Sequence, residues 1–304
     1  MKKYSFVLIL FLYVGCSDEK DNTLEPYPSY YHLIRGAKLD SKNGNITSAL
    51  EKFAEAIEIV DYVHTHNFVW AAKEAKNIGN CKLAAKYIEK ALRQGITDVP
   101  ENLTDEGLLS DFLDCEMINK AQKSELIAML KKDNSQINFY LKDMLDSLYN
   151  VDQRIRNEGS RSEIKRIDSL NINMLIDLIN KFGFPDERLI GAKTAKNTFI
   201  IILHFDSDTD NCILGGMLFN ALHKGKLAPQ NYAWVVDRRR YWGPEKQEPY
   251  YYEIPTQKLK NLTKKERDEI DKRRYAIGLK PLSEMNISFK EDGRVIVTDH
   301  WTDF

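Results

Sequence analysis

The N-terminal half of the chain repeats itself with a spacing of 35 residues, and this repeat limits the possible folds more than any other feature. The repeated pattern is a glycine followed by two alanines, with one bulky apolar residue between the alanines. Glycine suits a tight turn, and small residues on one face of a helix let a second helix approach closely. The repeat therefore predicts two antiparallel helical hairpins. The matched positions are Gly44 and Gly79, Ala49 and Ala84, Phe53 and Ile88, and Ala56 and Ala91.

This pattern resembles tetratricopeptide repeats, whose period is about 34 residues. The resemblance covers roughly residues 29–95 and implies a surface that binds a protein or peptide partner. Each repeat leaves an apolar face open, so two repeats need further helices to cover them. Helical patterns near residues 105–113 and 116–130 are expected to do so, which gives a repeat unit over residues 29–131.

The chain begins with the pattern of an export signal. Lys2 and Lys3 precede the apolar run Phe6–Val14, which is nine residues long. A membrane-spanning helix needs about 20 apolar residues, so this run indicates a cleaved signal peptide over residues 1–15. Its end resembles the lipobox of bacterial lipoproteins, which implies that Cys16 is acylated. A plain secretory signal with an incidental cysteine is the alternative.

Acyl chains on Cys16 would hold the protein on a membrane that it does not span. Residues 16–28 are polar, contain two prolines, and are predicted to form a tether. The acidic run after Cys16 resembles the tag that sends some bacterial lipoproteins to the cell surface, and a solvated tether is the alternative. We expect a lipid-anchored protein of the cell envelope, on the periplasmic or surface face of the outer membrane.

The composition is that of a folded and nearly neutral protein. Hydrophobic residues make up 43% of the chain, and 44 basic residues face 45 acidic ones. Such a chain has a substantial core but no broad basic field, so we expect no nucleic-acid partner. Cys81, Cys115 and Cys212 are far apart and lack zinc-site spacing. They are expected to be free and buried, with one disulfide as the alternative.

Residues 132–304 are predicted to form a helical C-terminal domain with a small β-hairpin, so the chain as a whole is mainly α. Two segments have the form of capping boxes, in which a Ser or Thr and a later Glu satisfy the first turn of a helix. Apolar and polar residues alternate around Asp292 and Gly293, as in a hairpin. The expected helices lie at 134–157, from the capping box at 160–163 to 182, around 195–205, at 210–224, from Pro229 onward, and from the capping box at 263–266 to Gly278.

Polar residues and glycines follow one another across this domain in a distinctive order. They are Asp152-Gln153-Arg154, Asp168, Asn171, Phe182-Gly183-Phe184-Pro185 with Gly191, His204, Asp237-Arg238, Gln257, and Arg273-Arg274 through Leu279. This order resembles an uncharacterised bacterial family of unknown function that is common in lipoproteins. The resemblance covers about residues 134–282 and implies no particular reaction, because the family has no assigned activity.

His204 is the candidate general base of this domain, with Asp168 or Asp237 to orient its ring. Arg238 would hold an anionic group through its planar fork of donors. The alternatives are structural: His204 ends an apolar run and would be satisfied there, and Asp237 and Arg238 would form an ion pair. The candidate ligand-binding residues are Asp152, Arg154, Asn171, Arg238 and Gln257, and Asp152 can also pair with Arg156 one helical turn away.

Two further groups contain metal-ligand residue types, but neither predicts a metal site. His64 and His66 lie between the repeats and are expected to be solvated. Asp206, Asp208 and Asp210 alternate like calcium ligands, yet the glycine and distal Glu of a calcium loop are missing. A helix N-cap explains them better. No cofactor motif is present, so neither a metal nor a cofactor is predicted.

Two functions of different classes remain open after these exclusions. The first is a lipid-anchored interaction or scaffold protein that uses its repeats to bind a partner. The second is an envelope hydrolase with a His/Asp/Arg site in the C-terminal domain. They differ in whether the scattered polar residues of that domain meet in one site.

Overall fold

The computed structural model describes residues 26–93, 137–205, 212–243, 246–290 and 294–297, with single positions at 124 and 128. The described part is mainly helical with a two-stranded antiparallel hairpin near the C-terminus, as predicted. Several expectations fall outside it: the signal peptide, Cys16, the helices expected within 105–130, and the aspartates at 206–210.

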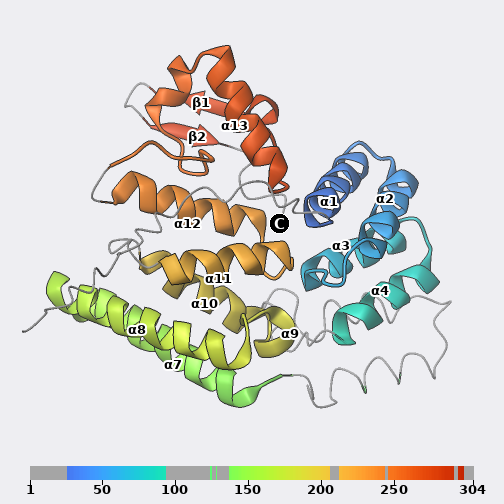
Figure 1. Cartoon of the computed structure of the whole chain (residues 1–304). Coiled ribbons are helices and arrows are strands. Elements are labelled where there is room, and N and C mark those ends of the chain that lie inside the picture. The colour runs from blue at the N-terminus through green and yellow to red at the C-terminus, as the bar shows by residue number, and fades with distance from the viewer. Residues whose placement is uncertain are drawn as a thin grey trace, which may run out of the picture.

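Two helical hairpins form the N-terminal part (Figure 1). The first pairs α1 (Tyr27–Lys42) with α2 (Ile46–Glu58), and the second pairs α3 (Thr65–Asn77) with α4 (Cys81–Arg93). Gly44 and Gly79 make the turns with φ of +82° and +75°, a region where a Cβ is costly. The two hairpins at the predicted spacing are therefore confirmed, although α1 begins two residues before the expected boundary at residue 29.

Phe53 lies at the centre of the hairpin core. Its ring meets the rings of Phe68 and Tyr87 edge to face, with centroids 5.9 Å and 5.1 Å away. Small residues let the helices approach around it, because Ala49 and Ala56 on α2 are fully buried. The same small–bulky–small pattern is buried on α4, so the sequence repeat marks the faces that pack together.

The C-terminal part begins with two long helices that run side by side, α7 (Phe139–Glu158) and α8 (Arg161–Phe182) (Figure 1). Helix α10 (Ala192–His204) packs against both α7 and α12 (Pro229–Trp242). Leu145, Leu175 and Ile201 are buried where α7, α8 and α10 meet. The remaining described helices are α9 (Glu187–Ile190), α11 (Cys212–His223) and α13 (Lys264–Ala276), with short 3-10 helices at Gln257–Asn261 and Leu282–Glu284.

The two capping boxes predicted in this part are confirmed. Ser160 and Thr263 each accept from the backbone N–H three residues later, and Glu163 and Glu266 complete the two capping boxes. Strands β1 (Ile287–Phe289) and β2 (Val295–Val297) pair antiparallel, and the residues expected to form the turn between them lie outside the described part of the chain. None of the described helices is long and apolar enough to cross a membrane.

The hairpins contact the C-terminal part through α1 and the start of α3. His32 of α1 stacks on Tyr275 with ring centroids 3.9 Å apart, and the backbone N–H of Thr65 donates to Glu187 Oε2 at 2.9 Å. His64 lies in this contact and is buried, so the expectation of a solvated histidine was wrong. The inter-repeat turn is covered by α9, which a sequence pattern cannot reveal.

Cys81, the first residue of α4, is disulfide-bonded, and its partner side chain lies outside the described residues. The expectation of three free cysteines was therefore wrong for Cys81. Spacing along the chain says little about such a bond, because only folding brings two distant cysteines to the separation of about 5.5 Å between Cα atoms that it requires.

Candidate functional site

Four polar side chains from three helices meet beside the C-terminal end of α10. His204 Nδ1 lies 2.8 Å from Asp152 Oδ2, and Arg156 Nη2 donates to Asp168 Oδ1 at 2.6 Å. Arg156 also pairs with Asp152 Oδ1 at 3.2 Å, so its guanidinium joins the two carboxylates. The group is called the His204 cluster below, and it consists of Asp152, Arg156, Asp168 and His204.

The positions of these residues follow from helix geometry. Asp152 and Arg156 are one turn apart, so both project from the face of α7 that Leu141 and Leu145 bury against its neighbours. His204 is the last residue of α10 and follows a run of buried apolar residues. The apolar contacts therefore bring the end of α10 against α7, and they carry the imidazole to Asp152.

Burial and neighbouring charges act in opposite directions on the two carboxylates. Asp152 is only 1% exposed, and this burial alone would raise its pKa. The hydrogen bond and charge of His204 and the guanidinium of Arg156 outweigh it, so the net pKa of Asp152 is lowered. For Asp168 burial is the larger effect and raises the pKa, although Arg156 opposes it.

The His204 ring has one nitrogen inside the cluster and one outside it. Nδ1 lies within 2.8 Å of both Asp152 Oδ2 and Arg156 Nε, and it cannot donate to one and accept from the other at once. A carboxylate is a stronger acceptor than a neutral ring nitrogen, so we assign the proton to Nδ1, donated to Asp152. Within the described residues Nε2 makes no hydrogen bond, and the side chain is 24% exposed. Its lone pair is then open to a ligand or to water.

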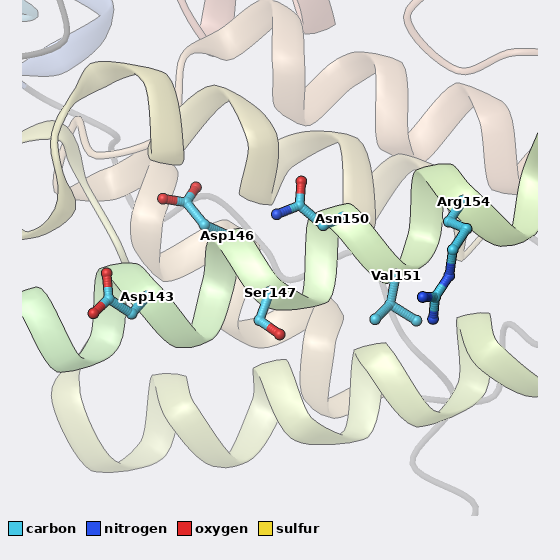
Figure 2. A pocket seen from close by; sticks show the side chains of 6 residues that line it. All are labelled: Asp143, Asp146, Ser147, Asn150, Val151 and Arg154. Atoms are coloured by element: carbon cyan, nitrogen blue, oxygen red, sulfur yellow. The ribbon is translucent and has the colours of Figure 1, made fainter.

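Two of the predicted ligand-binding residues, Asn171 of α8 and Arg154 of α7, are not part of the His204 cluster. Asn171 is buried and donates to the backbone carbonyl of Leu148, so it supports the packing of α8 on α7. Arg154 is exposed on the face of α7 opposite Asp152. There it lines an open groove of about 400 Å³, shown in Figure 2, which is separate from the His204 cluster. The other described residues that line this groove are Asp143, Asp146, Ser147, Asn150 and Val151.

Asp237 is fully buried and holds the loop that follows α12. Its two oxygens accept three backbone N–H groups, from Tyr250 at 2.6 Å, Tyr251 at 2.8 Å and Glu253 at 2.6 Å. Burial raises the pKa of Asp237 to about 6, although these donors act to lower it. A carboxylate with this many backbone partners is structural, and it makes no hydrogen bond or ion pair with His204 within the described part of the chain.

Arg238 and Gln257 also lie apart from the cluster. The Arg238 guanidinium stacks on the Trp242 ring, with 5.0 Å to the ring centroid. Gln257 is exposed at the start of its 3-10 helix. The cation at the candidate site is instead Arg156, whose position one turn from Asp152 was the only sequence signal for it. The structure thus brings Asp152, Asp168 and His204 together and leaves Asp237, Arg238 and Gln257 elsewhere.

The chemistry open to this site is that of a histidine oriented by a carboxylate. Among the described side chains, no three His, Cys, Asp or Glu residues are grouped as metal ligands. Comparison of the chain with protein-family models, with curated proteins and with solved structures found no match. The geometry of the site itself therefore carries the functional argument.

Proposed function

We propose that this is a lipid-anchored protein of the bacterial cell envelope, with its helical hairpins as a scaffold and a polar ligand site at His204. The signal peptide, the lipobox-like ending and the polar tether support the location. The disulfide at Cys81 is a further support, because disulfides persist in oxidising compartments outside the cytoplasm.

The scaffold role of the hairpins is supported by what their helices contact. Helix α1 and the start of α3 lie against the C-terminal part, through His32 and Thr65. A protein or peptide partner would therefore meet other surfaces of the hairpins. Leu39 and Ile78 are exposed apolar residues near the two hairpin turns, where such a partner can bury them.

The observation that carries the ligand site is the orientation of His204, with Nδ1 held by Asp152 and Nε2 open. In this state Nε2 accepts a hydrogen bond from a hydroxyl, an amine or a water molecule. The Asp152 carboxylate would stabilise the imidazolium that forms if the proton is transferred. Two carboxylates face one guanidinium here, so the site favours neutral or cationic groups over anions.

The same orientation favours hydrolysis as the second candidate function. A histidine of this kind can take a proton from an attacking water and return it to the leaving group. The substrate would be an envelope polymer or an exported molecule with an uncharged ester, amide or glycosidic bond. Arg156 has a structural part in this scheme, because both nearby carboxylates already engage it.

A panel of uncharged chromogenic esters, amides and glycosides tests both candidates. If the protein turns over any of them, His204→Gln should lower the rate by about 10²–10⁴-fold, the usual contribution of a general base. Arg154→Gln, on the opposite face of α7, is the matched control and should keep the wild-type rate. Turnover that survives His204→Gln would contradict the catalytic role. If no compound of the panel is turned over, only the ligand-binding proposal remains. A compound that binds at His204 should then raise the melting temperature of the wild-type protein but not that of His204→Gln.

A further inference from the structure

The contact between the hairpins and α9 contains a group of titratable side chains around Glu187. Glu187 Oε2 accepts the backbone N–H of Thr65 at 2.9 Å, and Oε1 lies 3.6 Å from His64 Nδ1. The backbone N–H of Glu187 donates to the hydroxyl of Tyr62 at 3.3 Å. This contact, called the joint below, connects residues that are more than 120 positions apart in the chain.

His66 belongs to the joint as well, and one of its ring nitrogens has no hydrogen-bond partner among the described residues. Its ring stacks on that of His64 with centroids 5.7 Å apart. Its Nε2 is buried, and no hydrogen-bond partner for it occurs among the described residues. The His66 side chain as a whole is partly exposed, but Nε2 itself is buried, so a proton added there would place a charge beside His64 without a hydrogen-bond acceptor, which is strongly unfavourable.

The charged and titratable groups around His66 come from every element packed at the joint. Glu187 is the nearby anion that would favour a charged His66, while His64 and Lys38 oppose it. Glu187 is already engaged by Thr65 and His64, so it offers His66 little compensation. The others are Tyr31 of α1, Tyr62 before α3, and Asp186 and Arg188 beside Glu187, with Lys226 paired to Asp186.

The pKa values of His66 and Glu187 are both lowered in the closed joint, so acidic conditions destabilise it. Burial, with the charge of His64, lowers the pKa of His66 to about 3. Burial would raise the pKa of Glu187, but the hydrogen bond and charge of His64, the charge of His66 and the Thr65 N–H lower it to about 2. Both groups bind protons more readily when the joint is open, so both favour opening as the pH falls.

We propose that the joint is acid-sensitive, and that protonation of His66 releases the hairpins from α9 while the helices themselves stay folded. His66 acts first on acidification, because an exposed histidine titrates at a pKa of about 6.5 and an exposed glutamate at about 4.3. The stabilisation that neutral His66 contributes is complete above pH 6.5 and is lost as the pH falls from there towards 3.

Hydrogen exchange at the Thr65 amide, corrected for the intrinsic rate at each pH, measures this opening. From the shift of His66 we expect the opening equilibrium to rise roughly 25-fold between pH 7 and pH 5. Amides within α10 serve as the internal reference and should change far less. In His66→Gln the rise should shrink to about twofold or less, the residual effect of Glu187. His204→Gln, which removes a histidine distant from the joint, should keep the full rise.

An equal pH dependence in wild type and His66→Gln would overturn the proposal, as would α10 amides that accelerate together with Thr65. NMR titration of the imidazoles in the wild-type protein tests the same proposal without a variant, so it applies even if His66→Gln does not fold. His66 should stay neutral down to pH 5, and a His66 ring that titrates near pH 6.5 in the folded protein would equally overturn the proposal.

Discussion

Replacing Arg274 by Met should lower the free energy of unfolding by about 3–5 kcal/mol, the usual effect of removing one partner of a buried ion pair. The Arg274 side chain is 1% exposed and pairs with Glu253 at 2.8 Å. It also donates to the backbone carbonyls of Tyr251 and Lys280, each at 2.6 Å. Its loss would leave the Glu253 carboxylate buried without its guanidinium and would release the loop that Asp237 also holds.

Arg273 supplies a matched control for this substitution. It donates to the Tyr250 carbonyl at 3.2 Å and stacks on the Tyr250 ring at 4.3 Å, but it is not buried. Arg273→Met should therefore cost about 1 kcal/mol or less. The double variant Arg274→Met with Glu253→Met should recover part of the loss, because a buried ion pair can be replaced by apolar residues. Urea unfolding measures all three, and equal losses for Arg273→Met and Arg274→Met would contradict the assignment.

Phe53→Ala should have an effect of similar size, about 3–5 kcal/mol, the usual range for removing a buried phenylalanine ring. Phe53 is fully buried and is the ring on which Phe68, Trp70 and Tyr87 converge. Alanine here would open a cavity at the contact between the two hairpins, and the helices on either side cannot collapse into it without losing their own packing.

The control for Phe53→Ala is Leu39→Ala, an apolar truncation in the same hairpin at a side chain that is 57% exposed. It should change the unfolding free energy by no more than about 0.5 kcal/mol. Thermal unfolding followed by circular dichroism compares the two variants. A loss at Phe53 as small as that at Leu39 would show that the two hairpins do not share this core.

The features that the sequence predicted correctly are those whose atoms lie within a few residues of one another. A capping box such as Ser160–Glu163 is complete within one helical turn, so the residue types at these positions are enough to predict it. The hairpin repeat is also local, because Gly44 and Phe53 act within a single helix pair. These short-range signals were enough for the helix order and the small β-hairpin.

The features that the sequence did not predict depend on contacts between distant segments. Arg274 lies in the last turn of α13, where a basic residue also complements the helix dipole. The sequence therefore offered no reason to predict that Arg274 is buried against Tyr251. Asp237 looked like a site residue for the same reason, since its partners are backbone groups more than ten residues later. Polar residue types alone do not distinguish a ligand site from a buried structural contact.

The candidate site was predicted in part. His204, Asp152 and Asp168 were all named from the order of polar residues, and the structure brings them together. The roles within the group differ from the prediction, because Asp152 is the residue that orients His204 and Arg156 is the central cation. Only the packing of α10 against α7 decides which acid lies nearest the imidazole.

The protonation of the His204 ring tests the central claim most directly. Nitrogen NMR of the imidazoles, with His204 assigned from the spectrum of His204→Gln, distinguishes which ring nitrogen carries the proton in the neutral form. The orientation described here predicts a proton on Nδ1, donated to Asp152, and a lone pair on Nε2. A proton on Nε2 would mean that Nδ1 accepts from Arg156, and the cluster would then be a structural ion network without an available base.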